Sequence, residues 1–177
     1  MKSFFAGLLI TTITCSCFSA QPKPKKEVEQ QGFGLGMDGP VVEHPVALSD
    51  EELAVLANDE LVKKELDQDP PIPKLTREGL EVGVIHLAGP NERDLVVVGS
   101  GSPFMGANVG PFWIIRDLPS GPVVVLHAIT LSLSLRKSRT KGLRDIELFA
   151  TTAVEGTTTV LHFDGAKYAF FKEWSTK

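Results

Sequence analysis

The sequence predicts a mostly β protein in which two small, related antiparallel β modules pack together and one N-terminal capped helix precedes them. Three observations predict this architecture. After Thr76 the chain consists of short runs rich in Val, Ile, Thr and aromatic residues, separated by turn residues. One earlier segment carries the signals of a helix start, and part of the strand pattern recurs later in the chain. With 177 residues, of which 42% are hydrophobic and 23% charged, the chain suits one globular domain.

Residues 1–20 have the layout of a secretory signal peptide. A basic start at Lys2 precedes an apolar run over residues 4–14, and small residues complete the segment. Both cysteines of the chain, Cys15 and Cys17, lie in this segment, so we expect a periplasmic or secreted protein without disulfides. The alternative is a lipoprotein anchored through one of the two cysteines, although neither has the leucine three positions upstream that bacterial lipoprotein signals usually carry.

Residues 21–47 are predicted to be a flexible linker. They begin with alternating proline and lysine and continue with a glycine-rich stretch over residues 32–39. Proline removes backbone donors and glycine raises the entropy that is lost on ordering, and few apolar residues offset either effect.

One helix is predicted over residues 48–69. Ser49 is a good N-cap, and Glu52, three residues later, completes a capping box. The proline cluster at residues 70–73 cannot continue a helix and therefore ends it.

Residues 75–177 are predicted to form the β-rich domain. Its expected strands are short and either apolar or alternating in pattern. They cover residues 80–87, 94–99, 111–116, 122–129, 131–136, 144–152, 157–163 and 167–172. Asp164 and Gly165 lie between the last two strands and predict a hairpin with a type I′ turn, in which both residues need a positive φ.

Part of the strand pattern recurs along the chain. Residues 93–97 (Arg-Asp-Leu-Val-Val) resemble residues 144–148 (Arg-Asp-Ile-Glu-Leu). We interpret this as two related modules of about 50 residues, with chance similarity as the alternative. Two propeller blades cannot close a ring, so the prediction is two small packed sheets with the helix closing one edge.

Two groups of residues are candidates for binding. The first comprises Phe104, Met105 and Asn108, in a glycine- and serine-rich loop between two predicted strands. An apolar pair in a polar loop either folds back onto the core or stays exposed as an anchor for a partner. The loop lacks the glycine spacing and the following helix of a phosphate-binding fingerprint.

The second group is basic. Arg136, Lys137, Arg139 and Lys141, followed by Arg144, place five positive charges within nine residues. This cluster is either a solvated loop that joins two strands or a local site for an anionic glycan, a lipid phosphate or an acidic partner.

No catalytic residue, metal ligand or cofactor site is predicted. The histidines lack the spacing of metal ligands, which favours core or sheet-edge roles: His44, His86, His127 and His162. The serine-nucleophile pattern Gly-x-Ser-x-Gly is absent. Four carboxylates lie at strand ends or turns, where aspartate commonly caps its own backbone: Asp94, Asp117, Asp145 and Asp164. An acid and base pair among these carboxylates is the alternative.

The pattern formed by residues 110–116 (GPFWIIR), 142–146 (GLRDI) and the Phe-Asp-Gly-x-x-Tyr end of residues 161–168 resembles a group of small exported bacterial proteins of unknown function. Residues 94–97 are similar to the repeats of integrin-type propellers. Residues 89–93 replace the aspartate-rich calcium loop of those repeats, so calcium binding is not carried over. The resemblance implies an exported β domain and supplies no activity.

The expected function is that of an exported, non-catalytic binding or interaction module of the bacterial envelope. Its expected partner is an envelope protein or an anionic glycan or lipid phosphate. The net charge of −4 gives no general attraction to nucleic acid, and no apolar run after residue 20 reaches the ~18 residues of a membrane helix. The alternatives are an envelope hydrolase that uses strand-end carboxylates, or an inhibitor of such an enzyme that inserts the loop at residues 100–110.

Overall fold

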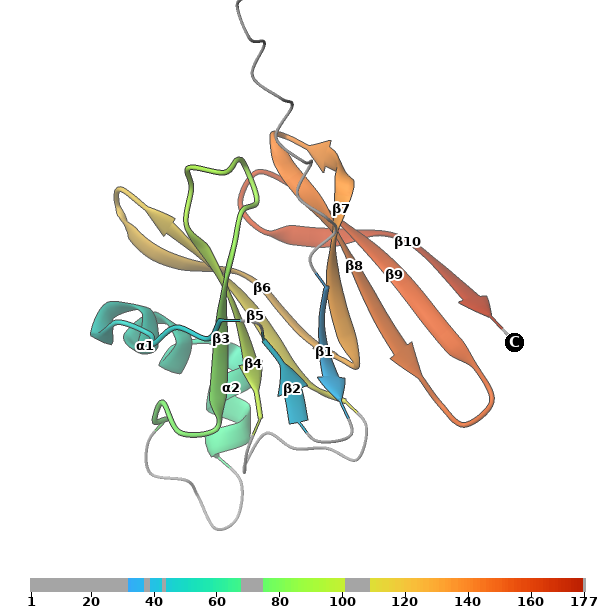
Figure 1. Ribbon diagram of the computed structural model, residues 1–177, viewed down its shortest axis with the longest axis horizontal. Coiled ribbons are helices and arrows are strands. Elements are labelled where there is room, and N and C mark those ends of the chain that lie inside the picture. Colours follow the sequence, from blue (N-terminus) through green and yellow to red (C-terminus); the bar gives the residue numbers. More distant parts are fainter. Residues whose placement is uncertain (1–31, 37–38, 43, 68–74, 101–108, 177) are drawn as a thin grey trace, which may run out of the picture.

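The expectation of a mostly β protein is confirmed by a computed structural model (Figure 1). The structure describes residues 32–36, 39–42, 44–67, 75–100 and 109–176. The helices in these ranges are α1 (Asp50–Ala57) and α2 (Glu60–Leu66), and neither is long and apolar enough to cross a membrane. The strands are β1 (Gly32–Gly36), β2 (Gly39–Val41), β3 (Leu80–Ile85), β4 (Asp94–Gly99), β5 (Gly110–Leu118), β6 (Gly121–Thr130), β7 (Ser132–Thr140), β8 (Leu143–Thr151), β9 (Gly156–Phe163) and β10 (Tyr168–Thr176).

Each sheet is built on a four-stranded meander. One sheet has the order β3-β4-β5-β6, and the other has the order β10-β9-β8-β7-β1-β2, so β1 and β2 extend the second meander. All neighbouring strands are antiparallel. The two meanders are similar in length and identical in topology, and the two sheets pack together as expected. Asp94 and Asp145 of the repeated pattern both lie in the second strand of their meander.

The strand β4 is buried along its whole length because different layers cover its two faces. Val96 and Val98 lie in the core between the sheets. Leu95 and Val97 belong to a second core that includes Leu56 of α1. Figure 1 shows the helices beside β3–β6, on the side away from β7–β10. Burial on both faces explains why residues 95–98 of this strand are all apolar instead of alternating with polar residues.

The structure corrects the single helix predicted over residues 48–69. The capping box is present, with Ser49 N donating to Glu52 Oε2 at 2.7 Å and Glu52 N donating to Ser49 Oγ at 3.2 Å. The helix stops after Ala57, and Asp59 begins a second one by accepting a hydrogen bond from Leu61 N at 3.0 Å. An aspartate competes with helix continuation because its carboxylate caps the next turn instead.

The structure also corrects part of the flexible linker predicted over residues 21–47. The strand β1 pairs with β7, and Phe33 at its centre lies in the core between the sheets with 7% of its surface exposed. Gly83 on β3 allows this approach, since a Cβ atom there would lie 2.9 Å from Val42 Cγ1 and 3.3 Å from Phe33 Cε1. Backbone pairing and the burial of one aromatic ring therefore offset the entropy that the glycine-rich composition costs on ordering.

The hairpin predicted at Asp164 and Gly165 is confirmed, but its turn is not type I′. Phe163 pairs with Tyr168 across a four-residue loop, in which Gly165 has a φ of 114° and Asp164 does not have a positive φ. A two-residue turn with positive φ at both positions joins β7 and β8 instead, at Lys141 and Gly142. Residues 136–140 are therefore strand, and the predicted basic loop is a hairpin end.

Replacing Phe33 with alanine is expected to lower the free energy of unfolding by about 3–5 kcal/mol, because it empties a position in the core between the sheets. Urea unfolding of the full chain measures this change. Val154→Ala is the control, since this side chain is 84% exposed between β8 and β9, and its effect is expected to stay within about 0.5 kcal/mol. Equal midpoints for the wild type and Phe33→Ala would show that residue 33 belongs to a linker.

Candidate functional site

Part of the predicted site lies outside the described residues. This holds for Phe104, Met105 and Asn108, and also for the expected signal peptide over residues 1–20. Their roles stay predictions. The structure does describe the basic candidates Arg136, Lys137, Arg139 and Lys141.

Most charges of this basic group are used within the protein. Arg139 Nη1 donates to three carbonyl oxygens, those of Leu87 (2.7 Å), Ala88 (2.8 Å) and Gly142 (3.0 Å). Arg136 forms an ion pair with Glu147 of β8, and Lys141 Nζ donates to a carbonyl of the β9–β10 loop. Lys137 is exposed on β7. These contacts fasten the β7–β8 hairpin to its neighbours, and the anion site stays a prediction.

Two of the strand-end carboxylates are buried. Asp94 accepts hydrogen bonds from Arg116 Nε and Leu87 N, both at 3.2 Å, and burial raises the pKa of its carboxyl group despite these bonds. Asp145 Oδ2 lies 3.7 Å from His162 Nε2, and its Oδ1 has no hydrogen-bond partner among the described residues. Both groups lie inside the fold, where a substrate in solvent does not reach them.

A third strand-end carboxylate, Asp117, lies in a cavity of about 350 Å³ beside the start of α1. Arg93 lies between two acids there, with Nη1 at 2.7 Å from Glu52 Oε1 and 3.5 Å from Asp117 Oδ2. Burial raises the pKa of Glu52, but the hydrogen bonds from Arg93 and Ser49 lower it more, so the net shift is downward. Glu52 is therefore stabilised in its charged form, which does not suit a general acid.

The lowered pKa of Glu52 predicts a dependence of stability on pH. Because the folded-state pKa lies below the ordinary value of 4.5, the charged group stabilises the fold above that pH, and the contribution is lost as the pH falls through the folded-state pKa. Glu52→Gln is expected to cost about 1–2 kcal/mol at pH 7 and less at pH 3. Urea unfolding at both pH values measures this.

Glu51→Gln is the control for this prediction. Its side chain is exposed in the same helical turn, so its cost is expected to be smaller at pH 7 than that of Glu52→Gln. A cost for Glu52→Gln that does not change between the two pH values would contradict the prediction.

The structure brings together a carboxylate and an imidazole that the sequence keeps far apart. Asp59 Oδ2 lies 2.9 Å from His127 Nδ1, and Asp59 Oδ1 accepts from Leu61 N at 3.0 Å and Trp113 Nε1 at 3.1 Å. The Asp59 side chain is 9% exposed and that of His127 is 45% exposed. The carboxylate therefore fixes the imidazole, and Nε2 is the ring atom left for a ligand.

A cavity of about 460 Å³ adjoins this pair. It lies between the α1–α2 junction, the edge strand β6 and the β9–β10 loop. Its apolar lining comes from Val55, Val123, Val125 and Leu126, and Lys167 adds a positive charge. No group of three or more metal-ligating side chains occurs in the part of the chain that the structure describes.

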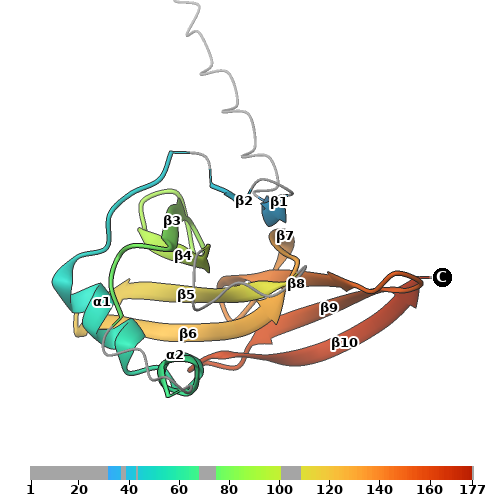
Figure 2. The same ribbon diagram turned by 90° about the horizontal axis from the view of Figure 1, so that it is seen from below.

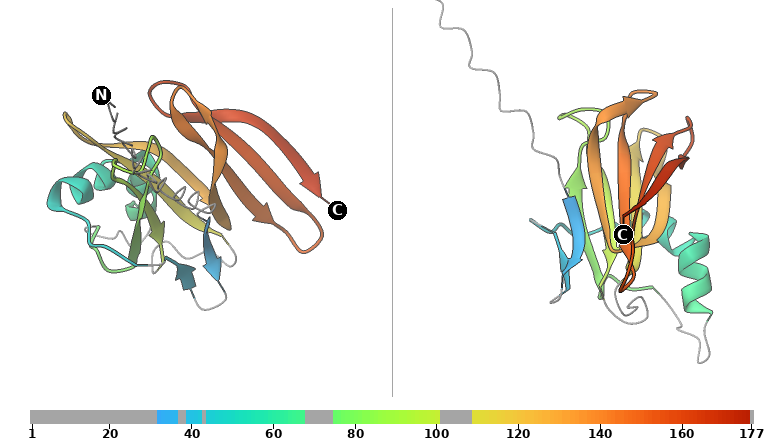
Figure 3. Two further views of the ribbon diagram at one scale, coloured as in Figure 1. Left: turned by 45° about the horizontal axis from the view of Figure 1, so that its top comes forward. Right: turned by 90° about the vertical axis from the view of Figure 1, so that its right-hand side faces the viewer.

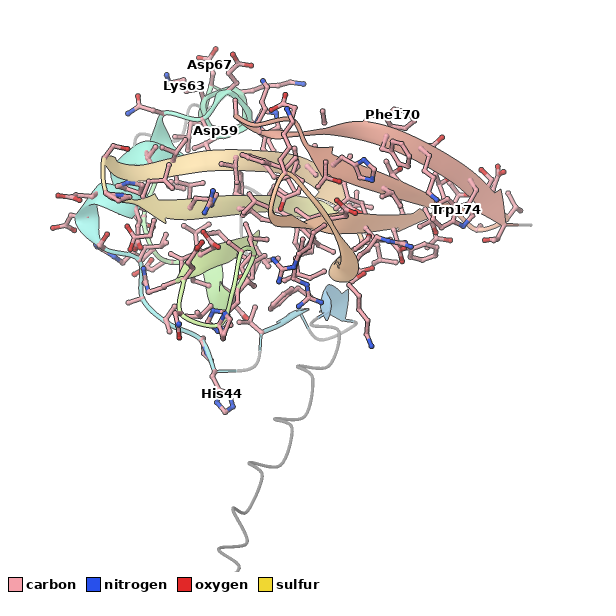
Figure 4. All side chains as sticks on the ribbon, turned by 90° about the horizontal axis from the view of Figure 1, so that it is seen from above. His44, Asp59, Lys63, Asp67, Phe170 and Trp174 are labelled. Carbon is pink, nitrogen blue, oxygen red and sulfur yellow. The ribbon has the colours of Figure 1, made fainter. Side chains whose placement is uncertain are left out.

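A second surface gathers aromatic side chains on β10. We call Phe170, Phe171, Lys172 and Trp174 the aromatic strip. The three rings are 66%, 52% and 40% exposed, respectively. Phe171 stacks on His162 with ring centres 3.8 Å apart, and Lys172 Nζ lies 5.7 Å from the centre of Phe171 and 5.4 Å from that of Trp174. Figure 4 shows Phe170 and Trp174 on the part of the molecule away from Asp59 and the helices.

The aromatic strip lies where β8–β10 project from the rest of the molecule (Figure 3). Lys172 and Trp174 pair with Val160 and Thr158, which alternate with Leu161 and so lie on the opposite face of the sheet from this core residue. Phe170 pairs with Leu161 and lies on the inner face instead, because a bulge at Phe171 shifts the register. Both faces of the projecting edge therefore carry aromatic side chains.

Comparisons with known proteins add no relative. No protein-family model matches the sequence, and neither a curated protein nor a solved structure was found that matches it. The resemblance of the C-terminal pattern to small exported bacterial proteins therefore stays a prediction.

The two tryptophans are expected to differ in their response to iodide, a fluorescence quencher that stays in water. Trp113 is buried, whereas Trp174 is exposed next to the positive charge of Lys172, which attracts the anion. Trp174→Phe is expected to remove most of the quenchable emission, and Trp113→Phe to leave it. Similar quenching of the two variants would contradict the exposure of the aromatic strip.

Proposed function

We propose that this chain is an exported, non-catalytic binding module that docks a protein partner on the aromatic strip of β10. The observation that carries the proposal is the exposure of three large aromatic side chains on one edge strand. Large apolar side chains that are exposed close together on a monomer typically mark an interaction site. Aromatic residues are also enriched at protein interfaces, and tryptophan in particular among the residues that dominate binding energy.

The geometry of the projecting edge supports a protein partner. Phe170 lies on the inner face of the sheet and Trp174 on the outer face, so a partner that packs around the edge can bury both rings. The faces of Phe171 are less suited to a sugar ring, since His162 stacks on this side chain and Lys172 lies near it. The ammonium group of Lys172 suits an acidic residue of the partner at the centre of the strip.

Two further observations support export and the lack of catalysis. The layout of residues 1–20 is that of a signal peptide. Asp94 and Asp117, which a hydrolase would use at the strand ends, are each held by an arginine. Asp94 is also buried, and each of the two carboxylates already has a cationic partner where a substrate would have to bind.

The test uses the full chain and a Phe171→Ser/Trp174→Ser variant as immobilised baits against proteins of the bacterial envelope. We expect at least one protein to be enriched by the wild type and lost with the variant. The purified partner is expected to bind the variant at least about tenfold more weakly, which corresponds to 1.4 kcal/mol. Surface plasmon resonance measures the affinity, and circular dichroism verifies that the variant is folded.

Ile129→Ser is the matched control, because this exposed apolar side chain lies on β6 of the other sheet. Ile129→Ser is expected to enrich the partner and to bind it with the affinity of the wild type. Partners retained equally by all three proteins, or no partner for any of them, would contradict docking on the aromatic strip.

A further inference from the structure

Apart from the aromatic strip, the molecule has a surface that follows the free edge of β6, which we call the β6 groove. This strand pairs with β5 alone, and its other edge makes no backbone hydrogen bond within the part of the chain that the structure describes. The cavity of about 460 Å³ runs along this edge and is lined by the five consecutive residues 123–127. An uncovered strand edge presents N–H and C=O groups at regular intervals.

Two layers flank this edge and turn it into a groove. The α1–α2 junction contributes Val55 and Asp59 on one side, and the β9–β10 loop contributes Lys167 and Tyr168 on the other. In Figure 2, β5 and β6 form one layer. The helical segment lies next to β6, and β9 and β10 extend from the other sheet.

A bulge shapes the lining of the groove. Ile114 pairs with Leu126 and Ile115 with Val124, so Val125 is an extra residue in β6. Consequently Val125 and Leu126 are both buried, and His127 is turned toward solvent. The middle of the groove is therefore apolar, with an imidazole next to it.

Two polar side chains of the groove can contact a ligand. His127 Nδ1 is engaged by Asp59, and in the neutral imidazole with the proton on Nδ1 this leaves Nε2 to accept a hydrogen bond from an N–H group. Lys167 is exposed on one wall of the cavity, where Glu60 is also part of the lining, and its positive charge interacts with nearby Asp164 of the same loop. A ligand with N–H donors, apolar side chains and a carboxylate would match all three features.

We propose that the β6 groove binds an extended polypeptide segment by strand addition, with apolar side chains on the residue 123–126 wall and a carboxylate at Lys167. Only a polypeptide supplies backbone N–H and C=O groups at the spacing of the free edge, which distinguishes it from a fatty acid or other amphiphile. The inference is independent of docking on the aromatic strip, because no residue is shared between the two surfaces.

The test screens the full chain against a synthetic library of nine-residue peptides in which Val, Ile or Leu alternates with Thr, Asp or Glu. Fluorescence anisotropy is expected to show saturable binding by acidic members. Methylation of alternate backbone nitrogens, which keeps the side chains and removes N–H donors, is expected to weaken binding at least about tenfold. Amide hydrogen exchange in residues 121–130 is expected to slow when the peptide binds.

Matched lysine variants distinguish the groove from the aromatic strip. Lys167→Glu is expected to weaken the acidic peptides at least about tenfold, and Lys172→Glu, on the aromatic strip, to leave their affinity unchanged. Both lysines are exposed, so neither variant is expected to unfold the chain. Failure of every peptide to bind, equal affinity of the N-methylated peptide, or a larger loss with Lys172→Glu would overturn the proposal.

Discussion

Burial of β4 on both faces is the constraint on which the rest of the structure depends. A strand that is apolar at nearly every position has no face to leave in water, so it requires a covering layer on each side. Helix residues Leu56 and Val62 supply one layer, and Leu133 and Leu135 of the second meander supply the other. In the chain, the helices that form one layer come before the first meander, and the second meander that forms the other layer comes after it.

Hydrogen bonds and ion pairs of a few polar side chains fix the position of the helical layer on the first sheet. Asp59 caps α2 and at the same time accepts hydrogen bonds from Trp113 of β5 and His127 of β6, so one carboxylate joins three elements. Arg93 joins Glu52 of α1 to the end of β5 in the same way. Such groups are costly to bury without partners, and therefore they hold the layer in one position instead of allowing it to slide. The β6 groove exists because the helix junction is held there and does not cover the strand edge.

The sequence predicted what depends on neighbouring residues and missed what depends on distant ones. The bounds of β4 were predicted correctly, because an apolar run between turn signals is a local property. The Asp59–His127 pair joins residues 68 positions apart, and nothing in either neighbourhood indicates it. Phe33 was hidden in a glycine-rich stretch whose order comes from pairing with β7. The exposure of Trp174 follows from the position of β10 at the sheet edge, which topology decides and strand composition does not.

The two meanders share a topology but differ in what covers their outer faces, and this difference bears on docking. In the first, the outer face of β5 carries Trp113 and Ile115, which the helices cover. In the second, no helix of the described residues covers the outer face of β9 and β10, where Trp174 remains exposed. The first meander thus binds the helices on an outer face that carries an aromatic side chain, whereas in the second meander Trp174 is on a face that no helix of the described residues covers. A partner packed on the aromatic strip would complete on the second meander the layer that the chain itself supplies to the first.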